Sequence, residues 1–256
     1  MKITILSLFK EQFEGFINTS IIKRAIAKKV IEIEIIDIRT FTKDKNYRVD
    51  SAPVGGGAGL IMKCQPVLDA LNSVKTPTSY SIMTSPRGKT FNQKKAHEFK
   101  SKDHLIIMCG HYEGIDERVN DYVDELVSLG DFILTGGELA AMTISDAIIR
   151  LLDGAITHDS IEEESFENGL LEYPQYTEPY EYDGKKIPDI LYTGNHTAIK
   201  KWRQKQSLKL TKEYRPDLFE KYSLTKQDKK LLDELDSTET PKWEKTALEK
   251  GRKFVK

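Results

Sequence analysis

Short apolar runs alternate with longer stretches of helical spacing along the first 150 residues. Apolar or alternating runs, which are typical of strands, occupy residues 1–8, 31–36, 79–84 and 105–109. Helical spacing occupies the segments 9–29, 65–71, 92–100 and 139–152. Because strands and helices alternate, the sequence predicts an α/β fold in which helices cover both faces of a parallel sheet. The strict apolar and charged alternation of residues 31–36 favours a strand near the edge of that sheet.

Three apolar runs end in loops that carry glycine or proline. Residues 105–109 stop at Gly110, a second apolar segment over 125–129 stops at Gly130, and the strand over 79–84 runs into the turn 85–88. In open parallel sheets, small ligands bind beyond the carboxyl ends of the strands. We therefore expect the three loops to lie side by side and to form a small-molecule site.

A further glycine-rich loop lies between the second and third predicted strands. Residues 55–59 include Gly55, Gly56, Gly57 and Gly59. Such a loop lets backbone N–H groups approach a phosphate or a base closely, although a flexible surface loop has the same composition. No Gly-Lys-Ser/Thr follows, so the loop is not a P-loop.

Length and composition limit the class of protein. With 256 residues, 39% of them hydrophobic, the chain is long enough for one large domain or for a large and a small one. No apolar stretch approaches the roughly 20 residues that span a bilayer, so a cytoplasmic protein without membrane contact is expected. Cys64 and Cys109 lie far apart and neither belongs to a C-x-x-C pair, which argues against a disulfide framework or a zinc site.

Charge is distributed unevenly along the chain. The formal net charge is −1, but residues 195–256 carry 17 Lys and Arg against 10 Asp and Glu. No acidic residue lies between Asp189 and Glu213, where six Lys and Arg are concentrated. A polyanion is the partner that such a segment favours, and a solvated lysine-rich helix face is the alternative.

Two long motifs coincide with the glycine loops. They are CGHYEGIDERV at residues 109–119 and LGDFILTGGEL at residues 129–139. In these motifs the chain resembles the bacterial TrmD family, the tRNA (guanine-N1)-methyltransferases of the SPOUT class. The resemblance extends to the glycine-rich loop 55–59, Ser85-Pro86, Ser165-Phe166 and the segments 169–171 and 194–196.

The resemblance also implies an architecture. It implies an α/β fold with a parallel sheet, helices on both faces and a deep trefoil knot, followed by a small helical C-terminal domain. The implied domains are a cofactor-binding methyltransferase domain over residues 1–160, a linker over 161–174 and a basic tRNA-binding domain over 175–256. Periodicity alone does not predict the knot, which general topology rules disfavour.

The family uses S-adenosyl-L-methionine as methyl donor, bound in a bent conformation among the knot loops. Carried over residue by residue, the resemblance implies cofactor contacts from Thr84, Ser85, Pro86, Gly110, Tyr112, Leu129, Gly130, Asp131, Phe132, Ile133, Leu134, Gly136 and Gly137. Glycines admit adenine and ribose to the backbone, and the apolar side chains offer walls. No residue is assigned to a metal, and a dependence on Mg²⁺ stays open.

Methylation of guanine at N1 needs particular groups. N1 carries a hydrogen, so a base must remove it and a cation must face O6, where negative charge develops. The resemblance implies that Glu164 is the base, that Arg150 is catalytic and that Glu113 binds the guanine. Glu164 stands where the family has an aspartate before Ser-Phe. Alternatively, Arg150 complements its helix C-terminus, Glu164 belongs to a charged linker, and Glu113 pairs with an arginine.

The implied substrate is guanosine 37 of tRNA, beside the anticodon. The residues that resemble the family's RNA-binding positions are Gly55, Gly56, Gly57, Gly59, Asn195, His196 and Arg203. The family forms homodimers with a composite active site. Glu178, Ser51 and Ala58 depart from the common Arg, Asp and Pro of the family, which puts individual RNA contacts in doubt.

Two other functions stay open at this point. One is a related SPOUT enzyme that acts on ribosomal RNA or on a ribose hydroxyl. The other is a catalytically silent RNA-binding protein that keeps the cofactor fold, which the glutamate at position 164 makes conceivable.

Overall fold

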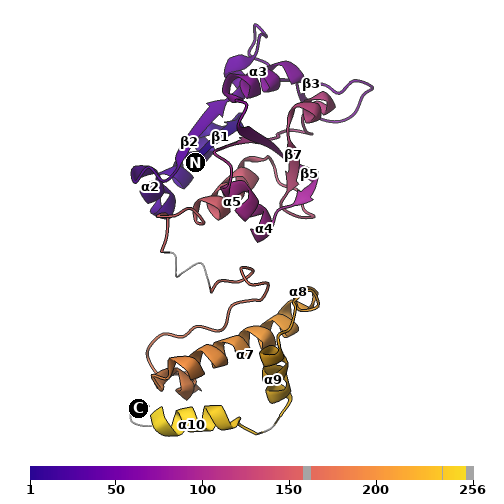
Figure 1. Cartoon of the computed structure of the whole chain (residues 1–256). Helices are drawn as coiled ribbons and strands as arrows, with labels where there is room; N and C mark the ends of the chain where they lie inside the picture. The colour runs from indigo at the N-terminus through magenta and orange to yellow at the C-terminus, as the bar shows by residue number, and fades with distance from the viewer. Residues whose placement is uncertain (158–162, 238, 252–256) are drawn as a thin grey trace. The chain divides into compact units, whose positions relative to one another are not determined.

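The structure, a computed structural model, describes residues 1–157, 163–237 and 239–251. The chain divides into two compact units, Met1–His158 and Asp159–Lys256 (Figure 1). The end of the predicted first domain (158–160), the first two linker residues (161–162) and the tail 252–256 lie outside the described residues.

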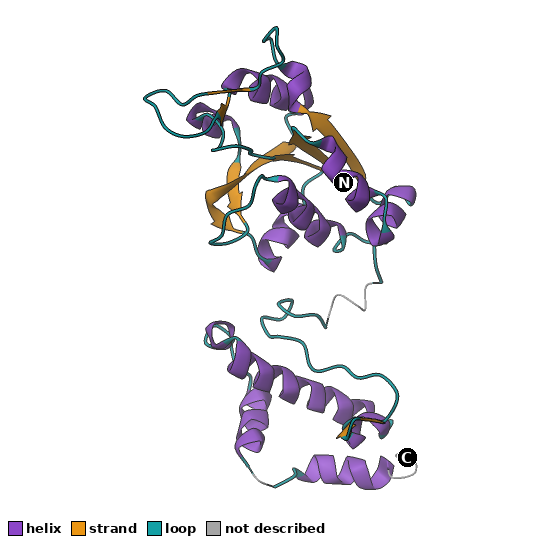
Figure 2. Cartoon of the chain, turned by 180° about the vertical axis from the view of Figure 1, so that it is seen from behind, coloured by secondary structure: helices purple, strands orange, loops and turns teal. Residues whose placement is uncertain are grey.

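The first unit is built on a five-stranded parallel sheet, drawn in orange in Figure 2. Its strands are β1 (Lys2–Ser7), β2 (Glu32–Asp37), β5 (Ser79–Thr90), β6 (His104–Met108) and β7 (Glu125–Ser128), in the order β2-β1-β6-β5-β7. The predicted parallel sheet is thus confirmed, with the alternating strand β2 at one edge. Ile5 and Leu6 point to opposite faces and both are fully buried, so helices cover the sheet on both sides.

β5 continues beyond the turn at which we expected it to end. Both Thr84 and Lys89 pair with Val127 of β7, so the residues between them bulge out of the ladder. A Cβ at Gly88 would lie 2.3 Å from the backbone nitrogen of Val127. Only glycine lets the two strands approach this closely, and the bulge turns residues 85–87 out toward the carboxyl edge of the sheet.

Helices pack on either side of the sheet. The helical segments are η1 (Lys10–Phe13), α1 (Glu14–Ile17), α2 (Ser20–Ala27), η2 (Ile38–Phe41), α3 (Cys64–Val74), α4 (Gln93–Lys100), η3 (Glu117–Tyr122) and α5 (Glu138–Ile149). α2, α4 and α5 pack together on one side and α3 lies on the other (Figure 1). A two-stranded ladder of β3 (Asp50–Ser51) and β4 (Ile61–Met62) flanks the glycine-rich loop.

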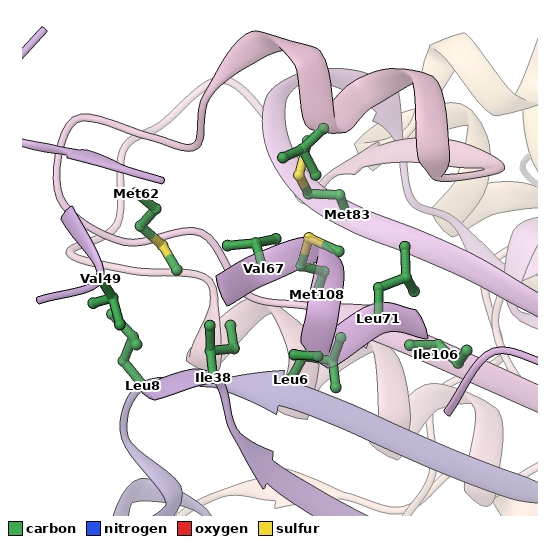
Figure 3. Close-up of a cluster of buried hydrophobic side chains, with 12 residues drawn as sticks. Leu6, Leu8, Ile38, Val49, Met62, Val67, Leu71, Met83, Ile106 and Met108 are labelled. Atoms are coloured by element: carbon green, nitrogen blue, oxygen red, sulfur yellow. The ribbon is translucent and has the colours of Figure 1, made fainter. Parts of the chain in front are cut away.

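The core beneath α3 joins strands that are distant in sequence. Figure 3 shows Leu6 of β1, Ile106 and Met108 of β6 and Leu71 of α3 meeting in one cluster, all at most 1% exposed. At about 25 cal/mol per Å² of buried apolar surface, each such side chain contributes about 1.5–3 kcal/mol. This cluster fixes the central strands from which the site loops leave.

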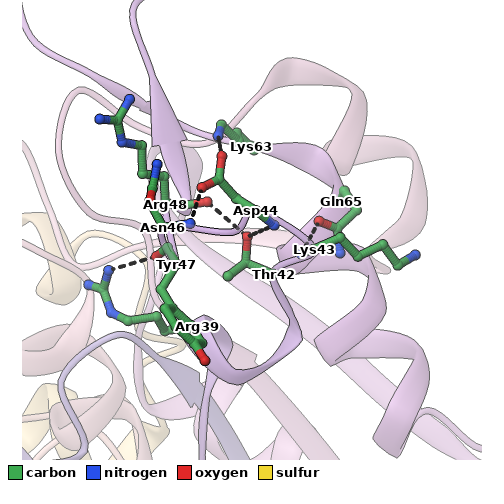
Figure 4. Close-up of polar contacts among 9 residues, drawn as sticks. All are labelled: Arg39, Thr42, Lys43, Asp44, Asn46, Tyr47, Arg48, Lys63 and Gln65. Carbon is green, nitrogen blue, oxygen red and sulfur yellow. Dashed lines mark hydrogen bonds and ion pairs between the residues drawn. The ribbon is translucent and has the colours of Figure 1, made fainter.

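A network of polar contacts joins the segment after η2 to the start of α3 (Figure 4). The Gln65 side chain accepts from the backbone N–H of Lys43 at 3.1 Å, and Thr42 Oγ1 donates to the carbonyl of Arg48 at 2.8 Å. Lys63 Nζ lies 3.5 Å from Asp44 Oδ2. The backbone N–H of Asn46, followed by other donors, lowers the pKa of Asp44. These bonds tie residues 42–48 to the start of α3.

The second unit is mainly helical. It contains β8 (Glu181–Tyr182), β9 (Lys185–Lys186), η4 (Asp189–Tyr192), α7 (His196–Tyr214), α8 (Pro216–Phe219), α9 (Lys226–Asp236) and α10 (Lys242–Gly251). Asn195 caps α7, because its side chain accepts from the backbone N–H of Ala198 at 3.2 Å. Trp202 is 6% exposed in a small core with Ile190 and Ala247. Within the described ranges, no helix is long and apolar enough to cross a membrane.

Candidate active site

The bulge of β5 and the loops that follow β6 and β7 line one cavity in the first unit. Its volume is about 890 Å³, within the usual range for small-molecule sites. The sequence-predicted cofactor residues among its lining are Thr84, Ser85, Pro86, Gly110, Tyr112, Leu129, Gly130, Phe132, Ile133, Leu134, Gly136 and Gly137. Asp131 is not among the lining residues. The expected convergence of three strand exits is therefore present in the structure.

The cavity wall also contains residues that the motif comparison did not select. They are Val54, Ile61, Met83, Arg87, His111, Gly114, Ile115, Asp116, Glu117, Val127, Ser128, Thr135 and Ala140. Most are neighbours of predicted residues in the same three loops. His111 and Arg87 are the chemically informative ones, because their side chains carry donors. Position next to Gly110 and Pro86 was the only sequence signal for them.

Gly137 shows how tightly the loops interlock. Its N–H donates to the carbonyl of Gly110 at 2.7 Å. A Cβ at Gly137 would lie 2.2 Å from Thr84 Oγ1 and 2.8 Å from the Cα of Cys109. The segment that leads into α5 is thus packed between the β5 and β6 exits. A side chain here would push them apart.

Glu113 connects the cavity to the glycine-rich loop. Its carboxylate is exposed and lines the cavity, and its N–H donates to the carbonyl of Leu60 at 3.0 Å. A Cβ at Gly59 would lie 2.4 Å from Glu113 Cγ. The glycines of this loop do not line the cavity, but the flanking residues Val54 and Ile61 do. The glycine-rich loop therefore packs against Glu113 at Gly59 without lining the cavity itself.

Arg150 lies away from this cavity within one chain. It is the C-cap of α5, whereas Gly137 is the N-cap of the same helix. The 12 residues of α5 span about 18 Å at 1.5 Å per residue. Arg150 is not among the residues that line the cavity. The structure therefore does not bring Arg150 and Glu113 together in one chain.

The second unit contains a cavity of its own, of about 810 Å³. Glu164, His196 and Arg203 are among its lining residues. Arg203 Nη1 lies 3.2 Å from Glu163 Oε2, and its guanidinium stands 4.5 Å from the centre of the Tyr173 ring. The Tyr173 hydroxyl donates to the same Glu163 oxygen. Burial, followed by this hydrogen bond, raises the pKa of Tyr173 to about 12. Three of the residues predicted for catalysis or RNA binding thus line the same cavity.

Two lysines of the basic helix α7 are paired with acids inside the second unit. Lys205 is 7% exposed, and its Nζ lies 3.7 Å from Glu234 and 4.0 Å from Glu244. Lys201 lies 3.8 Å from Glu234 and 4.5 Å from the centre of the Trp243 ring. The charge surplus of the sequence therefore overstates the positive surface that this helix offers to a polyanion.

Asp116 on the cavity wall is held in its ionised form. The guanidinium and backbone N–H of Arg118 bind its carboxylate, which lowers the pKa of Asp116 well below its ordinary value. A carboxyl group with a depressed folded-state pKa stabilises the fold above its unfolded pKa, about 4, and loses that contribution as the pH falls further.

We therefore expect acidification from pH 5 to pH 3 to lower the stability of the wild type more than that of an Arg118→Gln variant. The difference should be small, because Arg118 is exposed and water screens the pair. Scanning calorimetry of both full-length proteins at the two pH values measures it. Equal acid sensitivity would show that the Arg118 side chain does not stabilise ionised Asp116.

No group of three or more His, Cys, Asp or Glu side chains is arranged to hold a metal ion among the described residues.

Comparison with known proteins supplies further information. The model of the family described as tRNA (guanine-1)-methyltransferase TrmD matches residues 1–221. A protein of Malacoplasma penetrans is 53% identical over 222 residues, which cover 87% of this chain and 98% of the relative. A Clostridium botulinum (strain 657) protein is 52% identical over 91% of this chain and 97% of its own length. A Ureaplasma urealyticum protein is 52% identical over 89% of this chain and 100% of its own length. All three relatives are named tRNA (guanine-N(1)-)-methyltransferase.

Proposed function

The chain belongs to the tRNA (guanine-1)-methyltransferase TrmD family, and from this premise we propose that it transfers the methyl group of S-adenosylmethionine to N1 of guanosine 37 in tRNA. The match over residues 1–221 carries the proposal and confirms the resemblance that the motifs indicated. The carboxylate of Glu113 on the wall of the loop cavity adds a chemical reason. We also propose that the reaction takes place in the cytoplasm, because its substrate is tRNA.

The cavity of the first unit fits a nucleoside cofactor. Its volume is adequate, and Gly136 and Gly137 line it with backbone alone, since an added side chain at either position would meet neighbouring protein atoms. Residues 129, 130 and 132–134 line the cavity, and in this proposal the adenine lies against this segment, between the side chains of Leu129 and Leu134. When bound, S-adenosylmethionine supplies an electrophilic methyl group on a sulfonium. The loops hold the acceptor nitrogen in line with that methyl group.

Glu113 selects the base in this proposal. Guanine presents N1–H and N2–H₂ donors, whereas adenine presents an acceptor at N1. A carboxylate on the cavity wall accepts from guanine and repels the adenine edge. The target must leave the base stack to reach the cavity, which suits an anticodon loop.

Glu164 accepts the N1 proton, and Arg150 stabilises the negative charge that develops on O6. Because Arg150 lies a helix length from Gly137, the proposal requires a second subunit. We propose a homodimer in which Glu164 of one subunit acts with Arg150 of the other. Phe132, Ile133 and Leu139 support such an interface, because these apolar side chains are 55%, 81% and 52% exposed.

RNA contacts follow from the same proposal. The space around the Cα atoms of Gly55 and Gly56 is open, because a Cβ built on either would meet no described atom outside its chain neighbours within 4 Å, and we propose that a phosphate approaches the loop there. In the second unit, we propose that the side chains of Arg203 and His196 contact the RNA. Asn195 acts first as a helix cap, and its contribution to RNA binding is to place His196 at the first turn of α7.

The interlocked loops also support the trefoil threading that the family implies. The segment before α5 passes between Thr84 and Gly110, with the Gly137 to Gly110 hydrogen bond at its centre. We propose that this passage is the knot crossing of a SPOUT fold.

The test is a methylation assay with unmodified tRNA and a labelled methyl donor. Mapping the product by mass spectrometry should give N1-methylguanosine at position 37, and the same tRNA with adenosine at position 37 should give none. Methylation of a ribose hydroxyl or of ribosomal RNA would identify the related SPOUT activity. Absence of any methylation, with tRNA still bound, would identify an RNA-binding protein.

A further inference from the structure

A buried carboxylate lies behind the cavity, at the start of α5. Glu138 is 2% exposed, and its Oε1 accepts from Ser7 Oγ of β1 at 2.8 Å. Burying a carboxylate costs several kcal/mol unless donors surround it. The N-terminal turn of α5 and the Ser7 hydroxyl offset part of this cost. Its second oxygen, Oε2, points toward His111, 3.8 Å from Nδ1.

His111 lacks the matching hydrogen bond. Its Nδ1 is buried and has no hydrogen-bond partner among the described residues. Leaving a buried polar atom unpaired costs about 1–3 kcal/mol, and 3.8 Å is too long for a hydrogen bond. The ring is confined by Phe9, at 4.7 Å between ring centres, and by Tyr112 at 4.9 Å. A shift of roughly 1 Å would bring Nδ1 into hydrogen-bond range.

Gly136, which lines the cavity, lies beside the space between the His111 and Glu138 side chains. A Cβ at Gly136 would lie 2.3 Å from Glu138 Oε2 and 2.6 Å from His111 Nδ1. The backbone of Gly136 forms a bridge with His111, and both residues line the cavity. The two side chains therefore meet at Gly136, where the loop 110–112 lies against the loop 136–137.

We propose that His111 and Glu138 are a positioning pair whose hydrogen bond, from His111 Nδ1–H to Glu138 Oε2, closes when the cavity is filled. The closed pair holds Gly110 and Tyr112 against Gly136 and thereby fixes the cofactor loops. The pair consists of this chain's own residues, and its closing rests on the proposed function, which names S-adenosylmethionine as the molecule that fills the cavity. Both residues lie inside the two motifs at 109–119 and 129–139, but the motifs assigned neither of them a role.

A double-mutant cycle on the full-length protein tests the pair, with S-adenosylhomocysteine as probe in calorimetric titration. His111→Ala and Glu138→Gln should each raise Kd about tenfold, which corresponds to about 1.4 kcal/mol. The double variant should be no weaker than the weaker single variant, because the two residues act as a unit. His111→Asn, which keeps a donor near Nδ1, should recover most of the loss. KM for the methyl donor should rise more than kcat falls.

A separate control shows whether each variant folds. Thermal unfolding of each variant shows whether it is native, and His111→Ala keeps the test decisive if Glu138→Gln fails to fold. Native His111→Ala with unchanged Kd, additive losses in the double variant, or no recovery with His111→Asn would each overturn the pair. Failure of the wild type to bind S-adenosylhomocysteine would overturn it too. A coupled loss of binding in a chain that methylates no tRNA would support the pair and count against the proposed function alone.

Discussion

The Glu164→Gln variant is expected to lower kcat for tRNA methylation by about 10²- to 10⁴-fold, the usual contribution of a general base. Glutamine keeps the size of the side chain but cannot accept the N1 proton. Binding of S-adenosylhomocysteine should be unchanged, because the cofactor cavity is lined by residues of the first unit. Single-turnover methyl transfer, with both substrates saturating, measures the loss on the chemical step itself.

Glu163→Gln is the matched control. Glu163 precedes Glu164 and is engaged by Tyr173 and Arg203, so its carboxylate is already committed. An exposed ion pair contributes about 0.2–1 kcal/mol, so the control should stay within about fivefold of the wild type. Equal losses in the two variants would indicate that linker charge, and not proton transfer, is what matters. Unchanged chemistry in Glu164→Gln would remove this residue from the mechanism.

Mixing two inactive variants tests the composite site. Heterodimers of Glu164→Gln and Arg150→Ala contain one site with both residues intact, provided that the two groups come from different subunits. Partial activity should therefore return on mixing and subunit exchange. Activity that stays at the level of the separate variants would mean that each site is built within one subunit.

The Gly137→Ala variant is expected to destabilise the first unit by about 1–3 kcal/mol or more, as overpacking does, and to abolish cofactor binding. The backbone of Gly137 tolerates alanine, with φ −81°. The penalty therefore comes from contact alone, since the added methyl would meet the Cα of Cys109 and the backbone nitrogen of Gly110 at 2.8 and 2.9 Å. Calorimetric unfolding and titration with S-adenosylhomocysteine measure the two effects.

Gly15→Ala is the control for this substitution. Gly15 lies in α1, and no atom of the described chain lies within 4 Å of its added Cβ. Alanine is favoured over glycine in a helix by about 0.5–1 kcal/mol, so this variant should be neutral or slightly stabilised. If Gly137→Ala behaved like Gly15→Ala, the three loops would have room to separate, and the interlocked site would be wrong.

The sequence predicted the parts of the fold that depend on local pattern. Continuous apolar runs identify strands such as β6 because both faces of a parallel sheet are buried, and Gly110 and Gly130 mark their exits. Convergence of those exits follows from the parallel sheet itself. The residues predicted to bind the cofactor were selected through motifs that coincide with these exits, and all of them except Asp131 line the cavity.

Other features depend on pairings that no local pattern reveals. Ser7 and Glu138 are 131 residues apart, and their hydrogen bond exists only after β1 and α5 have been packed together. The count of charges between Asp189 and Glu213 likewise did not show that Lys205 is buried against Glu234. The continuation of β5 beyond Thr84 depends on β7, which accepts both sides of the bulge.

Helix α10 should be kept when this chain is shortened. The family match ends at residue 221, so an alignment-guided truncation would discard both α9 and α10. Yet Ala247 packs beside Trp202, and Glu244 is one of two carboxylates facing the buried ammonium of Lys205. Removing α10 alone would open this small core to water and leave the ammonium with Glu234 of α9, and a truncation at residue 221 would remove both carboxylates. A trimmed protein prepared for crystallisation or inhibitor screening should therefore retain α10 through Gly251.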